Sequence, residues 1–150
     1  MVALRLLFFE NGVLKAAVMA WLIAQVLKVI FFFVKYKRFN FERFVGAGGM
    51  PSSHSAAVSS VIVGVGMVEG WREPITAMAL IFGLIVMYDA AGVRYAAGKQ
   101  AEILNKIVDD IYHGGKVRED RLRELLGHTP YEVFAGAALG ALISFLVLSP

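Results

Sequence analysis

Long apolar runs separated by polar segments dominate the chain. Four runs are long enough to cross a membrane: residues 13–34, 51–68, 74–93 and 130–148. Each is close to the ~20 residues that a helix needs to cross a hydrocarbon core about 30 Å thick. The pattern predicts an all-α polytopic membrane bundle with four transmembrane helices, built by residues 1–150 as a single domain.

The polar connections between these runs differ in length. Residues 69–73 form a short turn, whereas residues 35–50 and 94–129 are long connections. Apolar residues recur at helical spacing within the longer one, and Gly114-Gly115 interrupts them. We expect short amphipathic helices there, the second over about residues 118–126, lying on or beside the membrane domain.

Positive charge is unequally divided between the two ends of the bundle. Four spans bring both long connections to one face, which then carries eleven of the fifteen Lys and Arg residues. Cytoplasmic connections of membrane proteins are enriched in Lys and Arg, so this face is predicted to be cytoplasmic.

Composition narrows the classes of partner and chemistry. The chain is 58% hydrophobic and has no cysteine, which excludes disulfides and thiolate chemistry. Residues 35–50 mix cations with aromatic residues, a pattern that suits the headgroup layer of a membrane. Membrane lipids are therefore expected partners, and no nucleic-acid partner is expected.

The start of the second run carries the densest chemistry. Gly48-Gly49-Met50-Pro51-Ser52-Ser53-His54-Ser55 combines glycines, a proline suited to a first helical turn, and serines able to cap free backbone N–H groups. A helix start of this kind can hold a phosphate, because its N–H groups and its dipole favour an anion. The alternative is a capped membrane helix without a ligand.

The four spans bring polar residues to the cytoplasmic face: Lys28; Ser52, Ser53 and His54; Asp89 and Arg94; His128, Thr129 and Glu132. An ionisable group within a span is costly and is a candidate for function. Lys28 has an alternative, which is to extend its ammonium to the headgroups. Asp89 has one too, which is to pair with Arg94 or Lys28.

Residues at the start of the fourth run fit two descriptions. Thr129 and Glu132 have the spacing of a capping box, with Pro130 at the first helical position. Glu132 is also four residues after His128, from where a carboxylate can orient an imidazole. Two histidines at helix starts on one face suit phosphoryl transfer, in which one attacks phosphorus and the other protonates the leaving oxygen.

These motifs resemble a known superfamily. Pro51-Ser52-Ser53-His54 resembles the Pro-Ser-Gly-His motif of the type-2 phosphatidic acid phosphatase and vanadium haloperoxidase superfamily. His128-x-x-x-Glu132, followed by Gly136 and Gly140, resembles the superfamily's His-x-x-x-Asp motif and its glycine-spaced helix. The Gly136–Gly140 spacing is also a close-packing motif of membrane helices.

The whole chain is similar to a divergent branch of that superfamily, small bacterial and plant membrane proteins related to acid phosphatases and vanadium-dependent haloperoxidases. The branch's features stand here as Ala24-Gln25-Val26-Leu27-Lys28, Gly48 to Ala56, Asp89-Ala90-Ala91-Gly92-Val93-Arg94, Ala97-Gly98-Lys99-Gln100-Ala101 and Leu125-Leu126-Gly127-His128-Thr129-Pro130. This resemblance implies an integral protein of the bacterial inner membrane.

The resemblance also implies site residues. His128 would be the nucleophile that forms a phosphohistidine, Glu132 would orient it in place of an Asp, and His54 would be the general acid. Ser52 and Ser53 would bind phosphate. Lys28 would stand for the lysine of the family's first motif.

A cation completes the family's phosphate site. The family has Arg six residues before the nucleophilic His, where this chain has Leu122 with an Arg on either side. Arg123 and Arg94 are therefore the candidates for phosphate binding, with Asp89 and Lys99 as supporting residues.

Two functions remain as hypotheses. The first is a phosphatase that hydrolyses a lipid phosphate monoester at the cytoplasmic membrane surface, with a histidine nucleophile and without metal or cofactor. The second is a lipid-phosphate-binding or scaffold protein that has lost turnover, suggested by the altered arginine position. Assembly as a homo-oligomer stays open.

Overall fold

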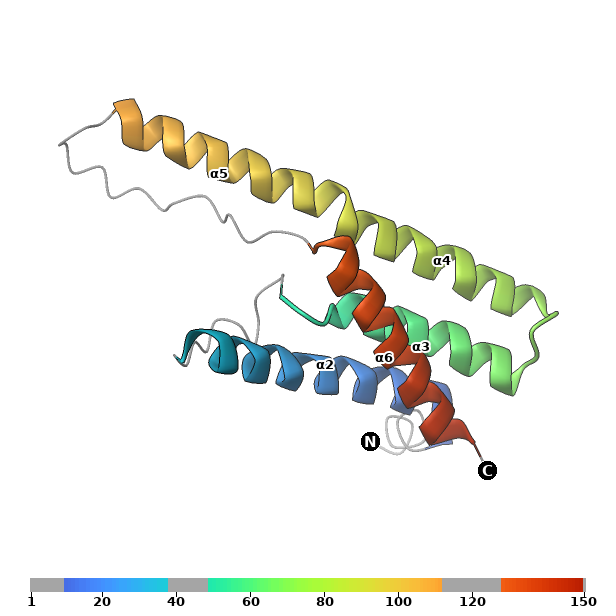
Figure 1. Cartoon of the computed structure of the whole chain (residues 1–150). Coiled ribbons are helices and arrows are strands. Elements are labelled where there is room, and N and C mark those ends of the chain that lie inside the picture. Colours follow the sequence, from blue (N-terminus) through green and yellow to red (C-terminus); the bar gives the residue numbers. More distant parts are fainter. Residues whose placement is uncertain (1–9, 38–48, 112–127, 150) are drawn as a thin grey trace, which may run out of the picture.

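The structure is a computed structural model that describes residues 10–37, 49–111 and 128–149, with backbone alone at residues 35–36, 93–94 and 109–111. Every regular element in these ranges is an α-helix (Figure 1). The helices are α2 (Gly12–Tyr36), α3 (Ser53–Val68), α4 (Pro74–Ala91), α5 (Val93–Ile111) and α6 (Pro130–Leu148). The expected helix near residues 118–126 lies outside the described residues.

The predicted all-α membrane fold is confirmed. Three apolar stretches are long enough to cross a membrane: Gly12–Val34, Pro74–Val108 and Pro130–Leu148. The fourth predicted span is α3, a shorter apolar helix of 16 residues. α3 is the central helix of the bundle, because it packs against α2, α4 and α6.

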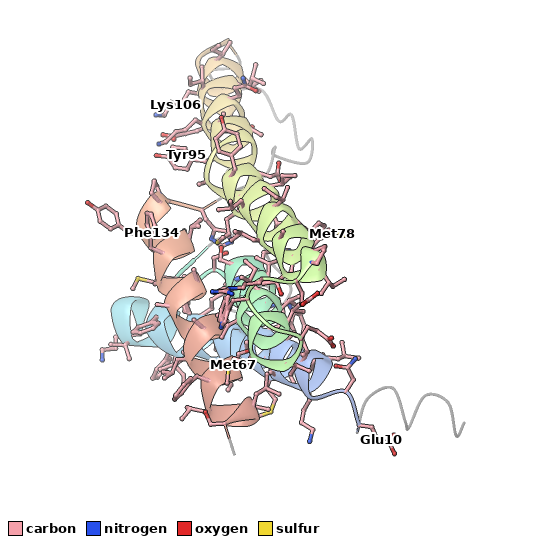
Figure 2. The ribbon with its side chains drawn as sticks, turned by 90° about the vertical axis from the view of Figure 1, so that its right-hand side faces the viewer. Glu10, Met67, Met78, Tyr95, Lys106 and Phe134 are labelled. Carbon is pink, nitrogen blue, oxygen red and sulfur yellow. The ribbon has the colours of Figure 1, made fainter. Side chains whose placement is uncertain are left out.

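α5 continues α4 almost in line, with Gly92 between them (Figure 1). The first amphipathic helix expected in the 94–129 connection is present as α5, but it begins directly at the end of the third span. Figure 2 shows Lys106 toward the far end of α5, beyond the start of α6. The apolar face of α5 includes Ile103 and Leu104, both exposed.

α3 and α6 run parallel and pack at their small residues. A side chain on Gly136 or Gly140 would collide with the α3 backbone, at Ser52 and Ala56 respectively. Further along, the hydroxyls of Ser60 and Ser144 lie 2.9 Å apart. Facing residues are offset by 84 positions at each of these three levels, so the two helices stay in register. Such small-residue faces let membrane helices approach backbone to backbone.

A face of small residues on α2 closes the bundle. Ala20 and Ala24 are fully buried against Ala56, and Leu139 and Ile143 of α6 pack on this cluster. Small side chains here allow α2 to approach both α3 and α6 closely. The polar residues at the starts of α3 and α6 are thereby held beside the later turns of α2.

Candidate phosphate site

The first turn of α3 is capped by its own serines. Gly49 precedes it with a φ of 89°, a left-handed conformation that favours glycine. Ser52 is the N-cap, and its Oγ accepts hydrogen bonds from the Ser55 N–H at 3.3 Å and the Ser55 hydroxyl at 3.0 Å. The sequence therefore determines this helix start locally, through residues three positions apart.

The first turn of α6 contains the predicted capping box. The Thr129 hydroxyl accepts from the Glu132 N–H at 3.4 Å, and Glu132 Oε2 accepts from the Thr129 N–H at 3.0 Å. Pro130 occupies the first helical position, as expected. The carboxylate of Glu132 is thus turned back toward the helix start, where His128 lies.

Glu132 also contacts the His128 imidazole. Glu132 Oε2 lies 3.1 Å from His128 Nδ1, so one oxygen receives both the backbone cap and the ring nitrogen. An ionised carboxylate only accepts hydrogen bonds, so the contact with ionised Glu132 selects the tautomer with the proton on Nδ1. In that tautomer Nε2 is the nitrogen with the lone pair. The two descriptions of Glu132 left open by the sequence, cap and orienting group, are both present.

His128 is nearly fully buried, with 2% of its surface exposed. Among the residues that the structure describes, its Nε2 atom makes no hydrogen bond. Buried polar atoms are nearly always paired, so an unpaired one calls for an explanation such as a ligand or a catalytic role. Here the unpaired atom is the nitrogen that has the lone pair in the tautomer selected by Glu132.

Backbone hydrogen bonds tie the helix starts to one another. The Ser52 N–H donates to the Glu132 carbonyl at 3.0 Å, and the His128 N–H donates to the Ala90 carbonyl at 2.9 Å. The starts of α3 and α6 and the last turn of α4 therefore meet around His128. Neither bond was predicted from the sequence, because each joins backbone atoms far apart along the chain.

His54 lies next to His128. The centroids of the two imidazoles are 6.5 Å apart, and the rings are inclined by 60°. The His54 side chain is exposed whereas that of His128 is buried. The two rings are thus near enough to act on a single small group, with His54 on the outer side.

Lys28 brings a cation to the same place from α2. Only 4% of its surface is exposed, and its Nζ donates to the Ser53 hydroxyl at 3.1 Å. The ammonium is therefore directed into the bundle rather than to the headgroups. Ser53 is itself buried, so this pair lies inside the helix packing.

The remaining candidate residues come from α4, from α5 and from the part of the chain that the structure does not describe. Asp89 is partly buried in the last turn of α4, next to Ala90. Lys99 lies on α5 with an exposed side chain, and its Nζ pairs with Glu102 at 3.0 Å. The Arg94 side chain and the whole of Arg123 lie outside the described part of the structure.

The described side chains bring together groups of the kind that bind anions. In residues 10–37, 49–111 and 128–149, no three His, Asp or Glu side chains gather closely enough to hold a metal ion. A buried ammonium, serine hydroxyls and two helix starts are groups that bind phosphate. The buried His128 imidazole lies beside these groups, with its Nε2 atom unpaired among the described residues.

Comparison with known proteins finds one family and one similar membrane protein. Residues 9–143 match the model of a family described as the divergent PAP2 family. The chain is 37% identical over 148 residues to the "uncharacterized membrane protein YuiD" of Bacillus subtilis (strain 168), covering 91% of this chain and 94% of that protein. No solved structure matches the chain.

Proposed function

We propose, from the premise that this chain belongs to the divergent PAP2 family, that it is a membrane phosphatase acting on a lipid phosphate monoester. The observation that carries the proposal is the state of His128. Its Nδ1 atom lies 3.1 Å from Glu132 Oε2, and its Nε2 atom is buried and unpaired among the described residues. A nucleophile held in this way needs only a phosphorus atom within reach.

In the first step, His128 Nε2 attacks phosphorus. The N–P bond forms as the P–O bond to the lipid alcohol breaks, and His54 gives its proton to the departing oxygen. Glu132 stays ionised and stabilises the positive charge that develops on the ring. In the second step a water gives a proton to His54 and attacks phosphorus, the N–P bond breaks, and inorganic phosphate leaves.

The negative charge on the phosphoryl oxygens is stabilised best by hydrogen-bond donors that are already in position before the substrate binds. Lys28 Nζ and the Ser53 hydroxyl already lie 3.1 Å apart and are buried, so they need little reorganisation to receive an anion. The positive end of the α3 helix dipole adds to them. These donors support binding of a dianionic phosphate monoester without a resident metal ion.

We further propose that the site faces the cytoplasm from the bacterial inner membrane. The excess of Lys and Arg in the connections on the site's side supports this orientation. A lipid substrate is supported by the surroundings of the site, because three of the apolar stretches that contribute residues to it are long enough to span a membrane.

The test is phosphate release by the purified protein in lipid vesicles, offered phosphatidate, phosphatidylglycerophosphate and isoprenoid phosphates in turn. We expect hydrolysis of at least one of them, abolished in His128→Ala and strongly reduced in His54→Ala. His113→Ala is the control, since His113 is the remaining histidine of the chain and has no role in the proposal. Full activity of both His128→Ala and His54→Ala would overturn the assigned roles.

Trapping the phosphohistidine intermediate distinguishes an enzyme that turns over its substrate from a protein that only binds it. An acid-labile phosphoryl group should appear on the wild-type chain during turnover and be absent from His128→Ala. Binding of vanadate with no hydrolysis of any phosphate lipid would instead indicate a lipid-phosphate-binding or scaffold protein. This alternative is suggested by Leu122, which stands where the family has Arg six residues before the histidine.

A further inference from the structure

The site residues lie at one level along the bundle. Hydrogen bonds join Lys28 to Ser53, Ser52 to Glu132, and His128 to Ala90. Sixteen residues separate this level from the opposite end of every helix that forms it: Gly12 to Lys28 on α2, Ser52 to Val68 on α3, Pro74 to Ala90 on α4, and Glu132 to Leu148 on α6.

The opposite ends of these helices are polar and lie together. Gly12 approaches Leu148, and Gly64 in the last turns of α3 approaches both Val13 and Leu148. Glu10 and Met67 lie at this end in Figure 2, away from Tyr95 and Lys106. Exposed residues gather there, and they mark a membrane boundary: Glu10, Asn11, Glu69, Trp71, Arg72 and Glu73.

The sixteen-residue separation gives the depth of the site in the membrane, because the rise of an α-helix per residue is fixed. Sixteen residues at 1.5 Å per residue span about 24 Å, whereas a hydrocarbon core is about 30 Å thick. With the polar ends at one boundary, the site lies roughly 6 Å short of the other boundary. The phosphate site is therefore inside the apolar layer and not at its surface.

α2 supports the same depth independently. Beyond Lys28 it continues with apolar side chains that are 41–58% exposed: Ile30, Phe31, Phe33 and Val34. The apolar stretch of α2 ends at Val34 and is 23 residues long, close to the length of a full span. Exposed apolar residues on a spanning helix face lipid, so lipid extends about 9 Å past Lys28 along α2.

We propose that this site acts below the headgroup layer, on a phosphate carried directly at the end of a single hydrocarbon chain. The inference rests on the proposed phosphatase function and narrows its substrate. A diacylglycerol phosphate that reached this depth would bring two ester groups into hydrocarbon without hydrogen-bond partners, which is costly. A phosphate attached directly to an alkyl or isoprenoid chain has no such groups, so only the phosphate itself must be received by Lys28 and Ser53.

Fluorescence quenching measures the depth, and the chain is convenient because it contains no cysteine. Fluorophores are attached to Ile30→Cys and Lys37→Cys, both at exposed positions of α2 or its C-cap. We expect lipids brominated on their acyl chains to quench the label at position 30, and aqueous iodide to quench the label at position 37. Equal quenching of both labels by iodide would overturn the inferred depth.

Matched substrates test the chemical class in vesicles. Farnesyl phosphate, phosphatidate and water-soluble ethyl phosphate are compared at equal surface or bulk concentration. We expect kcat/KM for farnesyl phosphate to exceed that for phosphatidate by about ten-fold or more, given the cost of burying unpaired ester groups. Ethyl phosphate should react far more slowly than farnesyl phosphate.

The outcomes separate the two proposals. Hydrolysis of phosphatidate as fast as farnesyl phosphate would overturn the substrate inference and leave the phosphatase function standing. Equally fast hydrolysis of ethyl phosphate would overturn the recessed site. Hydrolysis of none of the three would overturn the phosphatase function and the substrate inference together, while the quenching experiment still decides the depth.

Discussion

The Ser52 N–H donates a 3.0 Å hydrogen bond to the carbonyl oxygen of Glu132, so the first turns of α3 and α6 are joined backbone to backbone. This approach is possible because α6 presents Gly136 to the Ser52 backbone. Close packing of two helices thus sets the position of Glu132 and, through it, of the His128 ring. Packing and chemistry share the same residues at this end of the bundle.

Gly136→Ala tests that relationship. The added methyl group would collide with backbone atoms of Ser52, which cannot move aside as the end of a flexible side chain can. We expect a loss of about 1–3 kcal/mol in the free energy of unfolding, together with reduced activity, because the helix starts must separate. Thermal unfolding in detergent measures the first effect.

Gly12→Ala is the matched control for that substitution. Its methyl group meets only the end of the Leu148 side chain, which can rotate away. Stability and activity should stay near those of the wild type. Equal destabilisation by the two variants would contradict the close backbone approach at Gly136.

Glu132→Gln separates the two roles of Glu132. The amide oxygen can still accept from the Thr129 N–H, so the helix start survives, but the negative charge beside His128 is lost. By analogy with other oriented imidazoles, kcat should fall by roughly 10²–10⁴-fold with a small change in stability. Phosphate release and thermal unfolding are measured on the same preparation.

Thr129→Ala provides the opposite comparison. It removes the hydroxyl that accepts from the Glu132 N–H and should cost about 1 kcal/mol of stability. Activity should fall much less than in Glu132→Gln. A larger loss of kcat in Thr129→Ala would show that the cap, and not the carboxylate charge, is what the reaction needs.

Lys28→Met removes the buried cation and keeps an apolar chain of similar shape. The bundle should remain folded, since a buried unbranched apolar side chain fits helix packing. We expect vanadate affinity and kcat/KM to fall by roughly 10²-fold or more, the scale of losing one donor to a phosphoryl oxygen. Vanadate titration and steady-state kinetics check this.

Lys15→Met is the control on the same helix. Lys15 is exposed near the other end of α2, so its loss changes the net charge by the same amount without touching the site. Vanadate affinity should be unchanged. If the two variants weakened vanadate equally, the effect of Lys28 would be one of overall charge.

Ser60→Ala and Ser144→Ala test the α3–α6 contact farther from the helix starts. The Ser144 hydroxyl donates to the Ser60 carbonyl at 2.6 Å, and the two hydroxyls lie 2.9 Å apart. A double-mutant cycle should give a coupling of about 0.6 kcal/mol, as for other hydrogen bonds between membrane helices. Activity should be retained, because this pair lies two helical turns from Ser52. No measurable coupling would contradict the hydrogen-bonded pair.

Local sequence signals predicted most of the fold. The apolar runs predicted the positions of α2, α3, α4 and α6 to within a few residues. A long apolar run is by itself the signal of a helix in the hydrocarbon core, so no distant contact was needed. The capping box at Thr129 and the proline at position 130 are contacts within one turn, so their spacing was sufficient. α5 was predicted as a separate amphipathic helix, but its alignment with α4 depends on the conformation at one residue, Gly92.

The sequence by itself determined the spans, the helix caps and the glycine-spaced face of α6, because these depend on neighbours within a few residues. Only the tertiary structure decided which helix that face packs on, that Lys28 turns inward to Ser53, and that His128 Nε2 is buried beside His54. Those relations join residues far apart in the chain, and they depend on α2, α3, α4 and α6 meeting at one level. The level, sixteen residues from the polar ends, sets the depth at which the proposed reaction occurs.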